Sequence, residues 1–156
     1  MVLLLYSLFG VCYFPELQCQ IMKNNPNLSV ARAGKISEIV TQVSNDHGFN
    51  PKVYAAILMQ ESAYKLNAKG CNKYGCDYGI AQIHHKTAKV MGFDIDRLTS
   101  DLRYSIESGG EVLGWFFKFY SSREPGRWWV RYNCGTRKSI DRDSCNEYYR
   151  RVKRWM

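Results

Sequence analysis

Apolar residues recur at helical spacing through most of this chain, and this periodicity limits the folds that the chain can adopt. Between residues 100 and 120 one face carries an apolar stripe with a period near 3.6, made of Leu102, Ile106, Gly109, Leu113, Phe117 and Tyr120. Shorter stripes predict helices over residues 35–47, 51–64 and 144–155. No segment of any length alternates apolar and polar residues as a half-buried strand does. The sequence therefore predicts a mainly α domain.

Three glycines interrupt the helix predicted over residues 100–120. Gly109, Gly110 and Gly114 each lower helix propensity by roughly 1 kcal/mol. A helix tolerates this cost where another element approaches its backbone closely. We therefore expect this helix to be central, buried and tightly packed at its glycines.

Two short patterns predict where helices begin. Asn50 followed by Pro51 is typical of a helix start, with the asparagine as N-cap and the proline in the first turn. Ser144 and Glu147 have the spacing of a capping box, which predicts the last helix to start after Ser144.

Three segments of the chain differ in composition. Residues 34–156 carry the helical stripes and are expected to form one domain. Residues 21–33 are polar and are interpreted as a linker. Residues 1–20 form an apolar leader, in which the nearly uncharged run over 2–14 is shorter than the roughly 20 residues that span a bilayer. This run is typical of a signal peptide, whereas the lack of Lys or Arg before Lys23 leaves an uncleaved anchor or a buried N-terminal segment as alternatives.

The six cysteines indicate an oxidising compartment. Cys71 and Cys76 lie close together within or beside a turn, as do Cys134 and Cys145, and we expect each pair to form a disulfide. Two cysteines remain without a predicted partner, namely Cys12 and Cys19. The chain has no CxxC or Cys/His spacing of a zinc site, so we expect no metal and no other cofactor.

The chain carries a formal net charge of +8, from 22 Lys and Arg against 14 Asp and Glu. This charge suits a polyanionic partner, but it does not choose among a cell-wall polymer, a nucleic acid and an anionic lipid. Part of the excess lies at the end of the last predicted helix, in Arg150, Arg151, Lys153 and Arg154. A solvated helix face, whose cations favour the helix C-terminus, explains these four residues.

Glu61 lies on the apolar face of its predicted helix, four residues after Ile57 and eight after Val53. A carboxylate on such a face is desolvated, and desolvation raises its pKa because the charged form is disfavoured. A carboxyl group with a raised pKa holds a proton near neutral pH, as a general acid must. The alternative is a structural glutamate that reaches the edge of the stripe or pairs with an arginine.

Three short motifs follow one another along the chain. They are Glu61-Ser62, Gly79-Ile80-Ala81-Gln82 and Tyr132-Asn133-Cys134-Gly135. Their order and approximate spacing resemble the motifs of the soluble lytic transglycosylase catalytic domain, over roughly residues 35–156. Each motif alone is a weak signal, whereas three in order around a core-facing glutamate are specific. The resemblance implies a single lysozyme-like helical domain with a substrate groove for a sugar strand.

The resemblance also implies roles for the residues of the first two motifs. Glu61 would be the catalytic acid and base, and Ser62 would help to orient Glu61 or the substrate. Gly79 and Gln82 would line the groove beside the scissile bond.

Further roles follow for the C-terminal part. Tyr132 would donate a hydrogen bond to the catalytic carboxyl, Asn133 would contact the substrate, and Tyr148 would close over the same site. Arg131 departs from the family, which usually has a small residue there, and so puts the local packing in question. Cys134 also replaces a small residue, and a disulfide to the last helix explains it.

A second resemblance involves Asp77, sixteen residues after Glu61. The segment 77–80 looks like the stretch that holds the second catalytic carboxylate of animal-type lysozymes. Two carboxylates that flank a glycosidic bond permit hydrolysis, with Asp77 as nucleophile or as the base that activates water. A transglycosylase needs only one, because the 6-hydroxyl of the sugar attacks in place of water. The C-terminal motifs fit only the transglycosylase, in which Asp77 would shape the loop.

These patterns together predict a peptidoglycan lytic transglycosylase that cleaves the MurNAc–GlcNAc bond and forms 1,6-anhydro-MurNAc. The runner-up is a lysozyme-type hydrolase, or muramidase, of the same bond that uses Glu61 and Asp77. A non-catalytic wall-binding or particle structural protein is the rival from another class, and no nucleic acid is expected as a partner. The expected partners are peptidoglycan glycan strands and a phage particle or an envelope-spanning machine. The expected location is periplasmic or secreted, including a phage virion or the host envelope.

Overall fold

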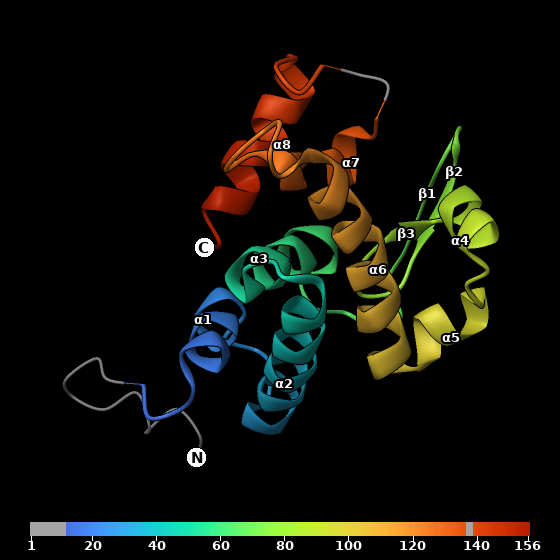
Figure 1. Cartoon of the computed structure of the whole chain (residues 1–156). Coiled ribbons are helices and arrows are strands. Elements are labelled where there is room, and N and C mark those ends of the chain that lie inside the picture. Colours follow the sequence, from blue (N-terminus) through green and yellow to red (C-terminus); the bar gives the residue numbers. More distant parts are fainter. Residues whose placement is uncertain (1–11, 137–138) are drawn as a thin grey trace.

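The computed structural model describes residues 12–136 and 139–156, which are arranged around the long helix α6 (Figure 1). The elements in chain order are α1 (Glu16–Asn24), α2 (Val30–His47), α3 (Pro51–Ser62), β1 (Lys69–Asn72), β2 (Gly75–Tyr78), β3 (Ile83–His84), α4 (His85–Met91), α5 (Ile95–Ser100), α6 (Leu102–Tyr120), the 3-10 helix η2 (Trp128–Val130), α7 (Arg131–Cys134) and α8 (Asp143–Lys153). Helices dominate, so the mainly α class predicted from the sequence is confirmed.

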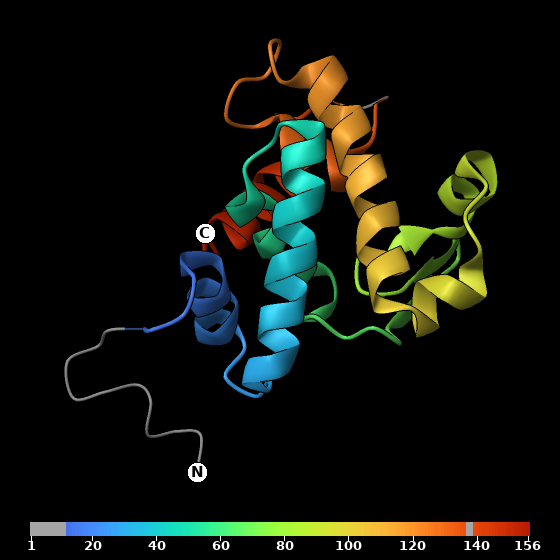
Figure 2. The ribbon, with the colours of Figure 1, turned by 60° about the horizontal axis from the view of Figure 1, so that its bottom comes forward.

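The glycines of α6 allow α2 and α3 to approach its backbone. A Cβ atom at Gly110 would lie 2.1 Å from Val43 of α2, and one at Gly114 would lie 2.4 Å from the ring of His47. At Gly109 the same atom would meet the hydroxyl of Tyr54 at 2.5 Å. Figures 1 and 2 both show α2 and α6 side by side. The close packing predicted at these glycines is therefore confirmed.

The cap residues of α3 set the position of its last turn. The Asn50 side chain accepts a hydrogen bond from the Lys52 backbone N–H, and Pro51 occupies the first turn, as predicted. The helix ends at Ser62, because Ala63 and Tyr64 adopt positive φ angles of 51° and 63°. The stretch after α3 leads directly into the sheet.

A small antiparallel sheet follows α3, in the strand order β1-β2-β3. The sequence analysis identified no strand in this part of the chain, so the hairpin of β1 and β2 was missed. Its strands are four residues long, and β1 is mostly exposed, so they lack the apolar alternation that identifies a strand. Cys71 and Cys76 are direct partners in the register of this hairpin.

Three cysteine pairs lie at disulfide distance, namely Cys12–Cys19, Cys71–Cys76 and Cys134–Cys145. The second bond links the two strands of the hairpin. The third joins α7 to α8. The pairings proposed for these four cysteines are thus the ones that the structure contains, and Cys12 with Cys19 adds a third.

The N-terminal part of the described chain differs from the expected polar linker over residues 21–33. Helix α1 covers the start of this range and α2 begins at Val30, five residues before the predicted start. Leu17 and Ile21 of α1 are buried in the core, which explains why this largely polar segment folds onto the domain. Most of the apolar leader, residues 1–11, lies outside the described residues.

The last helix begins two residues earlier than its predicted capping box places it. Arg142 is the N-cap of α8 and makes no side-chain cap hydrogen bond, so Ser144 lies inside the first turn. The predicted stripe is present, with Tyr148 and Val152 buried. Within the described residues, none of the helices has the length and apolar composition that a membrane crossing requires.

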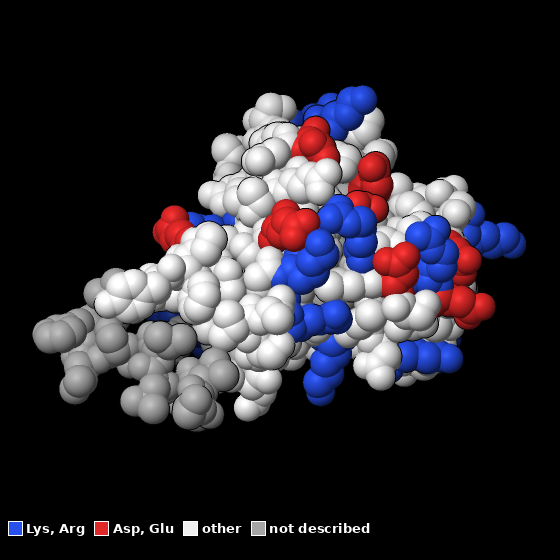
Figure 3. Space-filling model, turned by 90° about the horizontal axis from the view of Figure 1, so that it is seen from below, with Lys and Arg blue, Asp and Glu red and all other residues white. Residues whose placement is uncertain are grey.

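Charged side chains of both signs are interspersed on the face seen in Figure 3. Pairs of opposite charge also form within single helices, such as Lys35 with Glu38 and Arg103 with Glu107. Ion pairs at such exposed positions contribute little to stability. The positive net charge is therefore not gathered into one patch on this face.

Candidate active site

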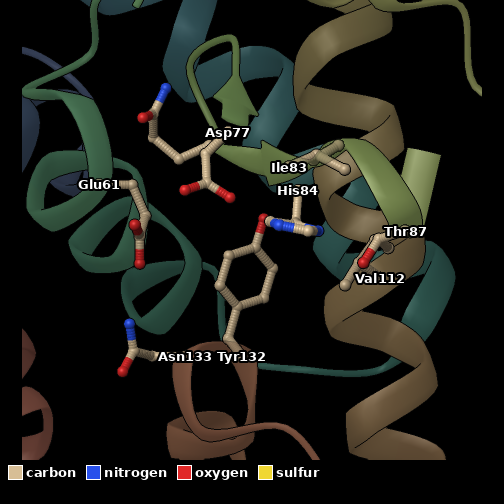
Figure 4. A pocket seen from close by; sticks show the side chains of 9 residues that line it. Glu61, Asp77, Ile83, His84, Thr87, Val112, Tyr132 and Asn133 are labelled. Atoms are coloured by element: carbon tan, nitrogen blue, oxygen red, sulfur yellow. The ribbon is translucent and has the colours of Figure 1, made fainter. Parts of the chain in front are cut away.

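A pocket of about 310 Å³ opens between α3, the sheet, α6 and α7 (Figure 4). Its lining consists of Glu61, Asp77, Gln82, Ile83, His84, Thr87, Val112, Tyr132 and Asn133. Residues from all three sequence motifs therefore meet at one place, although the motifs are spread over 75 positions of the chain, from 61 to 135.

Glu61 lies in the last turn of α3 and presents its carboxyl group to the pocket. Burial raises its pKa from 4.5 to about 7, a hydrogen bond from Tyr148 lowers it, and the nearby charge of Asp77 raises it. The Tyr148 hydroxyl donates this hydrogen bond to Oε1 of Glu61 at 2.6 Å. At neutral pH a large fraction of Glu61 is thus protonated, as a general acid requires.

The hydrogen bond to Glu61 comes from another tyrosine than the resemblance implied. Tyr132 was expected to hydrogen-bond the Glu61 carboxyl, but its hydroxyl donates to the Ala81 carbonyl at 2.7 Å. Tyr148 from α8 makes the bond to Glu61 instead. Tyr132 thereby fixes the turn after β2 to α7, while its ring lines the pocket.

Asp77 projects from β2 into the same pocket as Glu61, and both carboxyl groups face the open space in Figure 4. Burial raises the pKa of Asp77, and the neighbouring His84 and His85 lower it. His84 is the register partner of Asp77 on β3. The pocket therefore contains two carboxyl groups, those of Glu61 and Asp77. The charge of Asp77 also increases the tendency of Glu61 to hold a proton.

The turn over residues 79–82 joins β2 to β3 and is hydrogen-bonded to the last residue of α3. The Ser62 hydroxyl donates to the Ile80 carbonyl at 2.7 Å, so Ser62 secures this turn and not the carboxyl of Glu61. Gln82 has a φ angle of 49°, and its amide group donates to the Gly79 and Ala68 carbonyls. These bonds hold the Gln82 side chain where it lines the pocket.

Gly79 supports the pocket from beneath and is not among its lining residues. Its φ angle is 76°, and a Cβ atom there would lie 2.2 Å from the Leu98 carbonyl oxygen and 2.4 Å from Oγ of Ser105. The expectation that Gly79 lies in the groove beside the scissile bond stays a prediction. The turn needs glycine because of its backbone conformation and its close neighbours.

The C-terminal wall of the pocket is carried by α7. Asn133 is exposed and its side chain lines the pocket, while Cys134 is buried in the disulfide to Cys145. Arg131, the departure from the family pattern, is buried and forms an ion pair with Glu124. The buried guanidinium group is therefore neutralised by Glu124, and Arg131 does not disrupt the packing of α7.

Four lining residues were not identified from the sequence as site residues, namely Ile83, His84, Thr87 and Val112. His84 reaches the pocket through strand pairing, as the register partner of Asp77. Thr87 and Val112 reach it through the packing of α4 and α6. The sequence patterns carry no signal for these contacts.

Among residues 12–136 and 139–156, no group of three or more His, Cys, Asp or Glu side chains is placed to hold a metal ion. The site does contain carboxyl, hydroxyl, amide and imidazole groups. A carboxyl group with a pKa of about 7 that lines a pocket is suited to general acid catalysis.

Residues 38–151 match the family described as the transglycosylase SLT domain, and this chain belongs to that family. The family has the lysozyme-like helical fold, and it places the chain among proteins with lytic transglycosylase-type activity on peptidoglycan. No curated protein and no solved structure matches the chain.

Proposed function

We propose that this protein is a peptidoglycan lytic transglycosylase in which Glu61 is both the catalytic acid and the catalytic base. The observation that carries the proposal is the Glu61 carboxyl group, which faces the pocket with a pKa of about 7 and accepts a hydrogen bond from Tyr148. The substrate would be the bond between MurNAc and GlcNAc in a glycan strand.

The reaction needs two proton transfers, and one carboxyl group can perform both. Protonated Glu61 donates its proton to the glycosidic oxygen, and the bond from that oxygen to C1 of MurNAc breaks through an oxocarbenium-like transition state. The 6-hydroxyl of the same MurNAc then attacks C1 and gives its proton to the Glu61 carboxylate. The products are a free GlcNAc 4-hydroxyl and a 1,6-anhydro-MurNAc end, and Glu61 is protonated again.

Asp77 supports a second candidate function, because it lines the same pocket as Glu61. A hydrolase would use ionised Asp77 as nucleophile or as base for a water molecule. His84 and His85 favour the ionised form of Asp77, whereas burial opposes it. In the transglycosylase, Asp77 would instead shape the loop, and its charge raises the pKa of Glu61.

Product analysis separates the two reactions. Purified protein would be incubated with peptidoglycan, and the released fragments would be measured by mass spectrometry before and after borohydride reduction. We expect 1,6-anhydro ends, which borohydride does not label. Reducing ends in the products would instead identify the hydrolase.

Two substitutions test the residues. Glu61→Gln should lower turnover by about 10²-fold or more, the typical contribution of general acid–base catalysis, while the circular dichroism spectrum stays that of the native protein. Asp77→Asn should keep most of the activity. The exposed Glu16→Gln is the matched control. Full activity of Glu61→Gln would refute Glu61 as the catalytic acid, and collapse of Asp77→Asn would favour the hydrolase. A wild type that binds peptidoglycan and releases no fragments would favour the non-catalytic wall-binding protein.

We further infer a periplasmic or secreted location. Three cysteine pairs at disulfide distance suit an oxidising compartment, and peptidoglycan lies outside the cytoplasm. Fractionation of expressing cells, with peptide mapping under non-reducing conditions, tests both points. Association with a phage particle or an envelope-spanning machine stays a prediction that co-purification tests.

A further inference from the structure

An exposed aromatic surface lies on the second half of α6, outside the pocket. It consists of Trp115 and Phe119 with the buried ring of Phe116 beside them, and it is called the α6 aromatic face below. Trp115 and Phe119 are each 43% exposed, although most large apolar side chains of the described residues are buried. Their ring centroids are 4.8 Å apart, and that of Phe116 is 5.2 Å from Trp115. The rings form one cluster, and exposed apolar clusters of this kind often mark binding sites.

The α6 aromatic face continues the wall of the pocket. Val112 lines the pocket from α6 (Figure 4), and residues three, four and seven positions later lie on the same side of a helix. Those residues are Trp115, Phe116 and Phe119, of which Trp115 and Phe119 are exposed and Phe116 is buried. With a rise of about 1.5 Å per residue, the face extends about 10 Å along α6 from Val112, a length that a short run of sugar rings covers.

The chemistry of this face suits a polysaccharide. The flat face of a pyranose ring presents C–H groups with partial positive charge, and the face of an aromatic ring is negative, so the two stack. Trp is the best platform of this kind, because its ring is large and loses little conformational entropy. Lys118 lies beside Phe119 with its Nζ 5.8 Å from the ring centroid, and it adds positive charge next to a polymer whose peptides carry carboxylates.

We propose that the α6 aromatic face binds sugar units of the glycan strand beyond those held in the pocket, so that the protein prefers long strands to short fragments. This inference rests on the proposed function, because it assigns the face to the same substrate. The face would increase affinity for the strand, and Glu61 would remain the group that acts on the bond.

Binding to strands of graded length tests the inference. The Glu61→Gln chain would be titrated with peptide-free glycan strands of increasing length, and the dissociation constants would be measured by calorimetry. We expect affinity to rise with length and then level off. Adding Trp115→Ala and Phe119→Ala should weaken binding of the long strands about tenfold and make affinity nearly independent of length. Val90→Ala, at an 86% exposed site on α4, is the control and should keep the length dependence.

Each other outcome has a definite meaning. A length dependence that survives the Trp115→Ala and Phe119→Ala changes would overturn the inference and leave the proposed function intact. Failure of the Glu61→Gln chain to bind strands of any length would overturn both. The face could instead bind a second copy of the chain, and light scattering tests this alternative. If the protein forms concentration-dependent dimers and the same two changes abolish them, the face serves self-association and the inference is overturned.

Discussion

The pKa of Glu61 is set by effects of opposite sign, and its shift can be measured as a property of the folded protein. Burial and the charge of Asp77 raise its pKa, and the Tyr148 hydroxyl lowers it by stabilising the ionised form. The folded protein therefore keeps a proton on Glu61 at pH values where the unfolded chain, with a pKa near 4.5, has lost it. This difference links the stability of the protein to pH.

The first consequence concerns Glu61→Gln. Between pH 4.5 and about 7 the folded state binds more protons at this site than the unfolded state, so the wild type loses stability as pH rises through this window. The amide does not titrate. The free energy of unfolding of Glu61→Gln should therefore gain on that of the wild type by up to about 3 kcal/mol between pH 4 and 8, measured by urea denaturation. A difference that stays constant with pH would show that Glu61 has an ordinary pKa.

The second consequence concerns Tyr148→Phe. The change removes the donor that stabilises ionised Glu61, so the pKa of Glu61 should rise by about one unit, the equivalent of one hydrogen bond to a charged group. The alkaline limb of the pH profile of kcat/KM should move to higher pH by the same amount. Tyr149→Phe is the control, since its ring stacks on Trp129 away from the site. An unchanged limb would mean that the Tyr148 hydroxyl does not set the pKa.

Helical periodicity was enough to identify Glu61 as a candidate acid, but it did not identify its hydrogen-bond partner. The stripe of α3 placed a carboxyl group on an apolar face, and burial follows from that position. The choice between Tyr132 and Tyr148 depends on the direction of two side chains that come from different helices. That direction is set by the packing of α7 against α8, which the spacing along the chain does not encode.

At the scale of elements, the turn over residues 79–82 requires a glycine at position 79, because neighbouring atoms leave no room for a side chain. Gly79→Ala would place a methyl group 2.2 Å from the Leu98 carbonyl oxygen, and backbone atoms cannot move aside cheaply. We expect a loss of about 3 kcal/mol or more in the free energy of unfolding, measured by thermal or chemical denaturation.

Gly92→Ala is the matched comparison for Gly79→Ala. Gly92 has a similar φ angle of 72°, but a Cβ atom there would meet nothing within 4 Å. Only the conformational cost remains, about 1 kcal/mol. Equal losses for the two variants would show that contacts around Gly79 do not matter.

Elements with strong local signals were predicted, and those stabilised by pairing were not. The glycines of α6 and the Asn50 cap of α3 are where the sequence placed them. The hairpin was missed because strand pairing and the bond between Cys71 and Cys76 define it, without apolar alternation. The capping box at Ser144 matched a common pattern, yet α8 begins after Arg142.

At the scale of the whole molecule, α1 joins the two ends of the described chain. Ile21 is fully buried, and the side chains of Gln20 and Asn24 donate hydrogen bonds to the Trp155 carbonyl at 2.7 Å each. The sequence did not predict that α1 packs on the domain, because α1 has few apolar residues. It is held by contacts with residues that are distant in the sequence.

Ile21→Ala measures the contribution of α1. Removal of a fully buried isoleucine side chain typically costs about 2–5 kcal/mol, so the midpoint of chemical denaturation should fall clearly. Lys23→Ala, at an exposed site of the same helix, should change stability by no more than about 0.5 kcal/mol. A stability of Ile21→Ala equal to that of the control would mean that α1 is not part of the cooperative unit.

The contact between α1 and Trp155 also decides how the protein can be handled. It holds the C-terminus beside α1, on the side of the molecule opposite the β1–β2 hairpin (Figure 1). A bead or chip coupled through the last residues would therefore leave the pocket turned outward. Immobilised in this way, the protein could still bind insoluble wall fragments. Coupling through the hairpin would instead block access of these fragments to the pocket.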